Sequence, residues 1–133
     1  MIKTKLAYIF IDEFGFCRIR LDSSEHEVMG NEEALELCEA ITKVCDGTKR
    51  KLLTDSRGVQ GHVGLEAREI IRNHPGMLEF RVAEAFVVDN LPTRLIANFY
   101  LKFNRPPNPT RIFNSLESAE EWLNGLDLDQ KIA

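Results

Sequence analysis

Charged and polar side chains gather where two predicted strands end. They are Asp55, Ser56 and Arg57 after the first strand, and Asp89, Asn90, Thr93 and Arg94 after the second. If the two strands are parallel neighbours, both clusters lie at the carboxyl edge of the sheet, where open α/β sheets bind ligands. Acids, guanidinium groups and hydroxyls at this edge could recognise a polar group or a loop of a partner protein. The plainer alternative is that Asp55 and Asn90 cap backbone amides while the two arginines pair with acids.

The other reactive residues give little support for a catalytic or metal site. The histidines, His26, His62 and His74, are scattered and lack metal-ligand spacing such as HxxxH. No Ser-His-Asp set can be assembled, and the paired carboxylates at 32–33 and 120–121 fall on polar helix faces. An enzyme would need His62 or Ser56 to face a pocket with a base beside it. We therefore predict no catalytic residue, no metal and no cofactor.

A loop with glycines at positions 58, 61 and 64 precedes a predicted helix. Exposed amides at a helix start could bind a phosphate. The spacing is neither GxGxxG nor a P-loop, because no Gly-Lys-Ser/Thr follows. Turn geometry is therefore the favoured explanation of these glycines.

Composition limits the class of protein and its partners. The chain has 133 residues, which suits one domain (1–133, with a core at about 5–126), and a net charge of -4. Binding of nucleic acid would need a clustered basic face, and none is evident. No stretch reaches the roughly 18 apolar residues that a membrane span needs. Three cysteines without tight spacing fit a reducing cytoplasm, and we expect a cytoplasmic protein.

Strand and helix patterns alternate along the chain after an opening hairpin. The predicted strands are 5–11, 16–21, 51–54, 82–88 and 111–113, and a turn at 12–15 joins the first two. The predicted helices run from Asn31, as N-cap, to Cys45, from 63 to 74 with Pro75-Gly76 as the stop, from 91 to 103, and from an Asn114 or Ser115 cap to 126. This order predicts an α/β fold with a mixed sheet, an N-terminal β-hairpin and helices packed on the sheet.

The stretch from 82 to 103 is the most apolar part of the chain. Its strand is apolar on both faces, which is typical of a central strand covered on both sides. Glu84 is the exception, and we expect it to reach solvent. The helix that follows, with Leu95, Phe99 and Phe103, is apolar over more than one stripe. Simple burial is favoured, while a homodimer interface or a groove for a lipid-like ligand beneath residues 95–103 is the alternative.

Several segments resemble the small bacterial STAS proteins of the SpoIIAA-like, STAS/SEC14 class. They are KLLTDSRGV, AEAFVVDN, LPTRLIANFYLKFNRPPNPTRIF and the closing SLESAEEWL. The resemblance covers roughly residues 5 to 126 by order of elements. It implies a non-enzymatic domain that binds a partner protein, or a small or lipid-like ligand.

The chain departs from that class at one functional position. Its anti-sigma-factor antagonists carry a phosphorylatable serine at the start of the helix after this strand, in a motif like Asp-Ser-Ser-Gly-Leu. The corresponding segment here is Gly61-His62-Val63-Gly64-Leu65, and Ser56 lies too early to match. We therefore predict a regulatory binding module without assigning a phosphorylation site. The alternative function is a carrier with a cavity beneath the 95–103 helix.

Overall fold

A computed structural model describes residues 1–22, 29–59, 63–103 and 106–127. Its strands form one six-stranded sheet whose order in space follows the chain, β1-β2-β3-β4-β5-β6. The strands are β1 (Ile2–Lys3), β2 (Ala7–Ile11), β3 (Cys17–Leu21), β4 (Arg50–Asp55), β5 (Arg81–Val87) and β6 (Thr110–Phe113). The first three pair antiparallel, and β3 to β6 pair parallel. The predicted mixed sheet with an N-terminal hairpin is confirmed.

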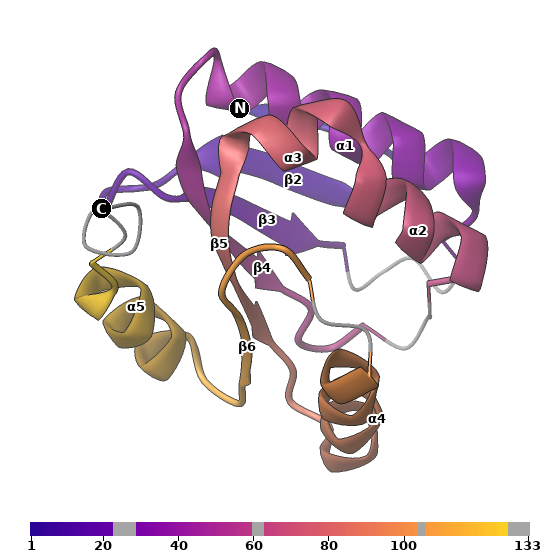
Figure 1. Ribbon diagram of the computed structural model, residues 1–133, viewed down its shortest axis with the longest axis vertical. Coiled ribbons are helices and arrows are strands. Elements are labelled where there is room, and N and C mark those ends of the chain that lie inside the picture. The colour runs from indigo at the N-terminus through magenta and orange to yellow at the C-terminus, as the bar shows by residue number, and fades with distance from the viewer. Residues whose placement is uncertain (23–28, 60–62, 104–105, 128–133) are drawn as a thin grey trace.

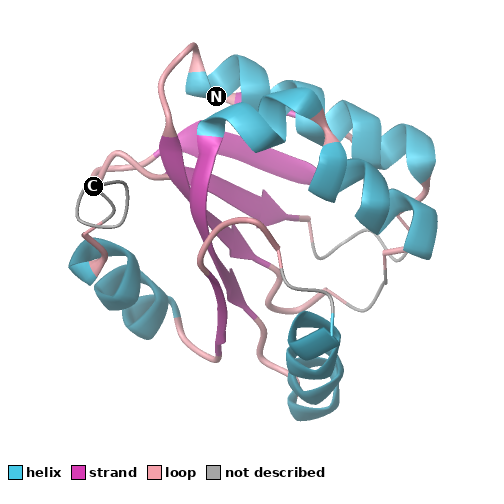
Figure 2. Ribbon diagram, in the orientation of Figure 1, coloured by secondary structure: helices cyan, strands magenta, loops and turns pink. Residues whose placement is uncertain are grey.

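The helices lie between and after the parallel strands (Figure 2). They are α1 (Asn31–Cys45), α2 (Leu65–Asn73), α3 (Pro75–Phe80), α4 (Leu91–Phe103) and α5 (Leu116–Gly125). Figure 1 shows α1, α2 and α3 together on one side of the sheet and α5 on the opposite side. In the part of the chain that the structure describes, no helix combines the length and apolar character of a membrane span.

Two apolar clusters hold these layers together. On the first face, Ile9, Ile19 and Leu52 of the sheet are buried with residues of α1 and α3 such as Ile41 and Met77. The second cluster lies between the sheet and α5. It contains Phe16, Leu53, Ala83, Ala85, Val87, Ala119 and Leu123. The predicted central strand is thus confirmed, since β5 lies between β4 and β6 with apolar side chains buried against α5.

The helical region after β4 is longer than the sequence predicts. Helix α2 ends at Asn73, before the predicted Pro75-Gly76 stop, and Pro75 then begins the additional helix α3, which the sequence pattern does not predict. Proline is favoured at a first helical position, where its missing N–H costs nothing. His74 caps this helix by accepting the backbone N–H of Gly76 on Nδ1 at 3.1 Å. The Pro-Gly pair therefore follows the end of one helix and begins the next.

The first predicted helix cap is wrong by one residue. Asn31 is the first helical residue of α1 and Gly30 is its N-cap. The Glu33 carboxylate accepts the Gly30 backbone N–H at 3.1 Å, so an acid in the first turn does the capping. At the last helix the sequence left two candidates, and the structure selects Ser115, whose hydroxyl accepts the Ser118 N–H.

Glu84 does not reach solvent, contrary to expectation. It is 6% exposed on the face of β5 that α1, α2 and α3 cover. Arg81 Nη1 lies 3.3 Å from one carboxylate oxygen, and the Thr54 hydroxyl donates to the other at 2.8 Å. Burial raises the pKa of Glu84, while the Arg81 charge and the Thr54 hydrogen bond act in the opposite direction. The residue is retained in the core because it has two partners.

Helix α4 exposes part of its apolar surface. Leu91 and Leu95, four residues apart, are 55% and 60% exposed. Among the described helices and strands, α4 packs chiefly against β6. The side chains of Ile96, Phe99, Tyr100 and Phe103 lie outside the described part of the chain, so the cavity predicted beneath this helix stays a prediction.

Candidate functional site: a groove at the carboxyl edge of the sheet

The two predicted polar clusters lie side by side. Strands β4 and β5 are parallel neighbours, with Asp55 opposite Val87. Beyond the strand ends, the Ser56 N–H and hydroxyl both donate to the Val87 carbonyl, at 3.0 and 2.8 Å. The Gly58 N–H donates to a carboxylate oxygen of Asp89 at 3.1 Å. The loop after β4 is therefore fastened to the end of β5, as the parallel arrangement predicts.

Asp55 and Arg57 form the central ion pair of this edge. One Asp55 oxygen accepts the backbone N–H of Arg57 and its Nε, at 3.1 and 2.9 Å. The other oxygen accepts Nη2 at 3.0 Å, so the contact is bidentate. The Asp55 side chain is 9% exposed and that of Arg57 is 43% exposed. The hydrogen bond to Asp55 raises the pKa of Arg57, which leaves a fixed cation at the surface beside a satisfied carboxylate.

The remaining predicted residues serve the backbone or lie outside the groove described below. The Asn90 side chain accepts the Thr93 N–H at 3.1 Å and so caps the start of α4. The Ser56 hydroxyl is engaged with Val87. Capping, the plainer alternative, thus describes Asn90, and pairing describes Arg57. Thr93 is exposed and Arg94 half-buried on the first turn of α4.

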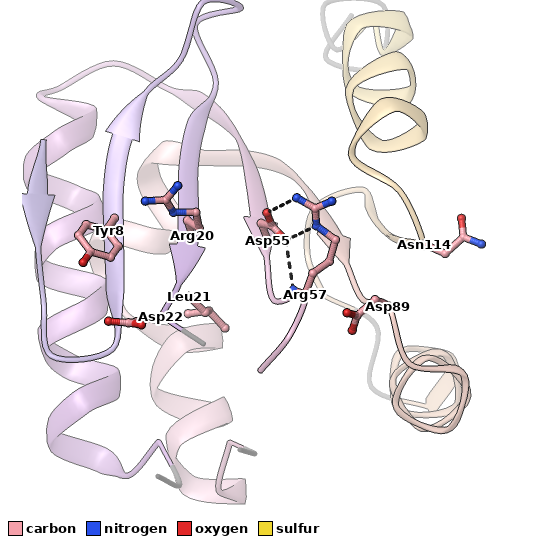
Figure 3. Close-up of a pocket in the computed structure, with 8 residues that line it drawn as sticks. All are labelled: Tyr8, Arg20, Leu21, Asp22, Asp55, Arg57, Asp89 and Asn114. Carbon is pink, nitrogen blue, oxygen red and sulfur yellow. Dashed lines mark hydrogen bonds and ion pairs between the residues drawn. The ribbon is translucent and has the colours of Figure 1, made fainter. Parts of the chain in front are cut away.

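An open groove of about 740 Å³ runs along this edge (Figure 3). Three of the predicted residues line it, namely Asp55, Arg57 and Asp89. The groove also takes in side chains that the sequence did not single out. They are Tyr8, Arg20, Leu21, Asp22 and Asn114. The site is therefore wider than predicted and extends from β2 to the end of β6.

One cross-strand row explains why these residues meet. In each pair of neighbouring strands, one residue stands directly beside a residue of the next strand. Residues in such paired positions share a face of the sheet. The row reads Lys3, Tyr8, Arg20, Asp55, Val87 and Phe113 from β1 to β6. In the sequence, Arg20 is a polar residue that alternates with the apolar Ile19 and Leu21. Its neighbours depend on strand register, which the sequence pattern does not fix.

Cations flank an aromatic ring at the β1–β3 end of the row. Lys3 Nζ lies 5.4 Å and the Arg20 guanidinium carbon 5.1 Å from the centre of the Tyr8 ring. Such contacts hold a cation over the ring while its charge remains accessible. In Figure 3, Tyr8, Arg20 and Asp55 follow one another from strand to strand. At the other end, Phe113 packs on Trp122 of α5, with ring centres 5.6 Å apart.

The described residues hold no cluster of metal ligands, and two of the three thiols interact: the hydrogen bond between Cys17 and Cys45 raises the pKa of Cys17 and lowers that of Cys45. No group of three His, Cys, Asp or Glu side chains within the described ranges could hold a metal ion. All three cysteines are buried. Burial raises the pKa of the Cys38 thiol to about 11, which keeps it protonated near neutral pH. His62 lies outside the described residues, so its prediction remains untested.

A comparison with protein families finds a match. A domain of unknown function, DUF7793, matches residues 19–127. The chain belongs to this family. The match includes the groove residues from Arg20 to Asn114 and leaves Lys3 and Tyr8 before its start. No curated protein matches the chain.

A solved structure shows the fold. An uncharacterized protein of the DUF3478 family with a SpoIIAA-like fold, from Shewanella loihica PV-4, superposes with a TM-score of 0.60 at 12% identity. The alignment covers 92% of this chain and 99% of that one. A protein of unknown function from Arthrobacter sp. FB24 is 20% identical over 92% of this chain and 96% of its own, with a TM-score of 0.30. The resemblance to the SpoIIAA-like class is thus confirmed as a likeness of fold.

Proposed function

We propose that this DUF7793 domain is a non-enzymatic regulatory module that binds a partner protein at the groove of the carboxyl edge. The observation that carries the proposal is the Asp55–Arg57 pair beside Asp89 in an open groove. The pair fixes the position of a charge of each sign without closing the groove. A loop of a partner protein with polar side chains fits such a surface, whereas a buried small molecule would need an enclosed, mostly apolar pocket.

The chemistry of the site supports binding over catalysis. The Ser56 hydroxyl, which follows Asp55 in the chain, donates its hydrogen bond to the Val87 carbonyl and not to a base. The Asp55 carboxylate uses both oxygens on Arg57. A nucleophile and a base within hydrogen-bond reach are the usual signature of covalent catalysis. The SpoIIAA-like fold is consistent with a regulatory role of this kind.

The test compares partner capture by two charge-matched double variants. Arg57→Gln with Asp89→Asn removes one cation and one anion from the groove and keeps the net charge. Glu39→Gln with Lys43→Gln does the same on the exposed face of α1, on the other side of the sheet. Both are used as bait in extracts of the native host, beside the wild-type domain, and the eluates are weighed by native mass spectrometry.

The proposal predicts one protein that co-purifies with the wild type and with the α1 variant. Its yield with the groove variant should fall at least about tenfold, the effect of losing roughly 1.4 kcal/mol of binding free energy. Equal yields from both variants would contradict the groove as the contact surface. A mass excess of a few hundred daltons on the wild-type domain would support the carrier alternative, and a doubled mass would indicate a homodimer.

A further inference from the structure

The sheet face opposite α1 is covered at one end only. Helix α5 packs against β4, β5 and β6, where Val87 and Phe113 of the cross-strand row join its apolar contacts. At the other end, Lys3 and Arg20 are exposed and Tyr8 is half-buried. In the described ranges of the chain, no helix lies over this β1–β3 end of the row. The patch formed by Lys3, Tyr8 and Arg20 is called the cationic row below.

Two arginines on the same strand differ in their carboxylate partners. Arg18 and Arg20 are two residues apart on β3, so their side chains stand on the same face. Arg18 pairs with Asp12 at 2.9 Å and with Glu120 of α5 at 2.7 Å. Arg20 has no carboxylate partner among the described residues, because α5 does not extend over it and Asp55 is engaged with Arg57. The fold therefore supplies acids to Arg18 and leaves Arg20 open.

We infer that the cationic row docks an acidic segment of the partner protein. The carboxylates of this segment form ion pairs with Arg20 and Lys3, as Glu120 does with Arg18. This inference rests on the proposed function and names the chemistry of the partner. The row is continuous with the groove through Tyr8 and Arg20, which line both. A segment that enters the groove beside Arg57 thus continues across β3 and β2.

Strand spacing sets the spacing of the acids. Lys3 and Arg20 lie on the two strands that flank β2. Adjacent strands are about 4.8 Å apart, so the two cations start from backbones roughly 10 Å apart. A peptide in the polyproline II conformation has three residues per turn and rises about 3.1 Å per residue, so side chains three positions apart lie on one face roughly 9 Å apart. The complementary segment therefore carries Glu or Asp at every third position.

Charge distinguishes an acidic peptide from a nucleic acid here. The chain has a net charge of -4, and the groove that continues the row contains Asp22 and Asp89 beside its cations. A polyphosphate backbone passing along the groove would be repelled by these acids, whereas a peptide can place neutral residues opposite them. The cations of the row are few and local, which suits a short acidic segment.

The test is an NMR titration with a defined probe, the acetylated peptide amide Glu-Gly-Ser-Glu-Gly-Ser-Glu. The same peptide with Gln for Glu is the uncharged control. The ionic strength is kept at about 0.02 M, where salt screens surface charges only weakly. We expect the acidic peptide to shift amide signals of β1, β2 and the end of β3. Arg20→Gln and Lys3→Gln should each weaken its binding two- to fivefold, as expected for about 0.4–1 kcal/mol per exposed pair.

Arg111→Gln is the matched control for net charge. Arg111 is exposed on the same face of the sheet, over Phe113 on β6, and outside the cationic row. Its replacement should leave peptide binding within experimental error. Equal weakening by Arg111→Gln and Arg20→Gln, equal binding of the Gln peptide, or tighter binding of a single-stranded DNA 12-mer would each overturn the inference. If only the peptide fails while the groove variant still loses its partner, the proposed function survives and this inference falls.

Discussion

The buried Arg81–Glu84 pair allows a quantitative prediction for the variant Arg81→Met. Removal of the guanidinium leaves the Glu84 carboxylate in the core with the Thr54 hydroxyl as its remaining partner. An unpaired buried carboxylate need not stay charged, because it can take up a proton. The free energy of protonation therefore sets an upper limit on the electrostatic cost of the substitution.

That limit depends on pH. A glutamate in an unfolded chain has a pKa of about 4.3, and each pH unit above it adds about 1.4 kcal/mol to the cost of a neutral carboxyl group. The limit is then about 3.7 kcal/mol at pH 7 and about 1.6 kcal/mol at pH 5.5. A folded-state pKa raised above the unfolded value gives stability that is complete below the unfolded pKa and is lost as pH rises. Loss of Arg81 raises this pKa further, so the destabilisation by Arg81→Met should grow with pH.

Urea unfolding of the wild type and Arg81→Met at pH 5.5, 7 and 8 measures this difference in the free energy of unfolding. Two variants serve as controls. The double variant Arg81→Met with Glu84→Gln has no ionisable group left in the pair. Its free energy of unfolding, measured relative to wild type, should therefore rise with pH, whereas that of the single variant should fall. Arg18→Met leaves Glu120, which is 23% exposed, in contact with water. It leaves the largely buried Asp12 carboxylate with the Phe14 and Phe16 N–H groups as donors, so its smaller cost should be constant over this range. A cost of Arg81→Met that is the same at pH 5.5 and 8 would refute the reasoning.

Two further predictions concern the packing of α1. A Cβ at Gly76 would overlap the Thr42 side chain, so Gly76→Ala should lower the free energy of unfolding by about 1–3 kcal/mol; Gly125→Ala, with nothing nearby, should not, and equal urea midpoints would contradict this packing. Because all three cysteines are buried and the pKa of Cys38 is raised to about 11, the folded protein should resist a thiol reagent such as DTNB at pH 8 and react only on unfolding. Rapid labelling of the native state would show that the thiol is accessible.

The sequence predicts the fold where hydrophobic pattern alone decides the structure. Strand β5 lies between β4 and β6, as its largely apolar faces predict, and the Asp55 and Asp89 clusters meet because β4 and β5 are parallel. It does not predict Glu84, because the partner Arg81 comes from the first residue of the same strand, which periodicity does not relate to position 84. Burial of a charge depends on the partner that the three-dimensional structure provides.

Strand register limits the prediction of the site. The hairpin turn lies at 12–15, as the sequence predicts: the Gly15 N–H donates to the Asp12 carbonyl, the Asp12 N–H donates to the Phe16 carbonyl, and Gly15 has a positive φ of 80°. A shift of one residue in a hairpin changes which residues stand opposite one another. With this register Tyr8 stands beside Arg20, and β3 then places Arg20 beside Asp55. The cationic row therefore depends on a single glycine turn.

The agreement between strand order in space and strand order in the chain has a consequence for synthesis on the ribosome. Each strand that leaves the exit tunnel finds its only earlier partner already in place, so the sheet can grow without waiting for distant segments. The exception is the apolar face of β5, which stays uncovered until α5, near the end of the chain, has emerged. We expect nascent chains stalled before residue 116 to be held by chaperones, and release to follow the addition of this last helix.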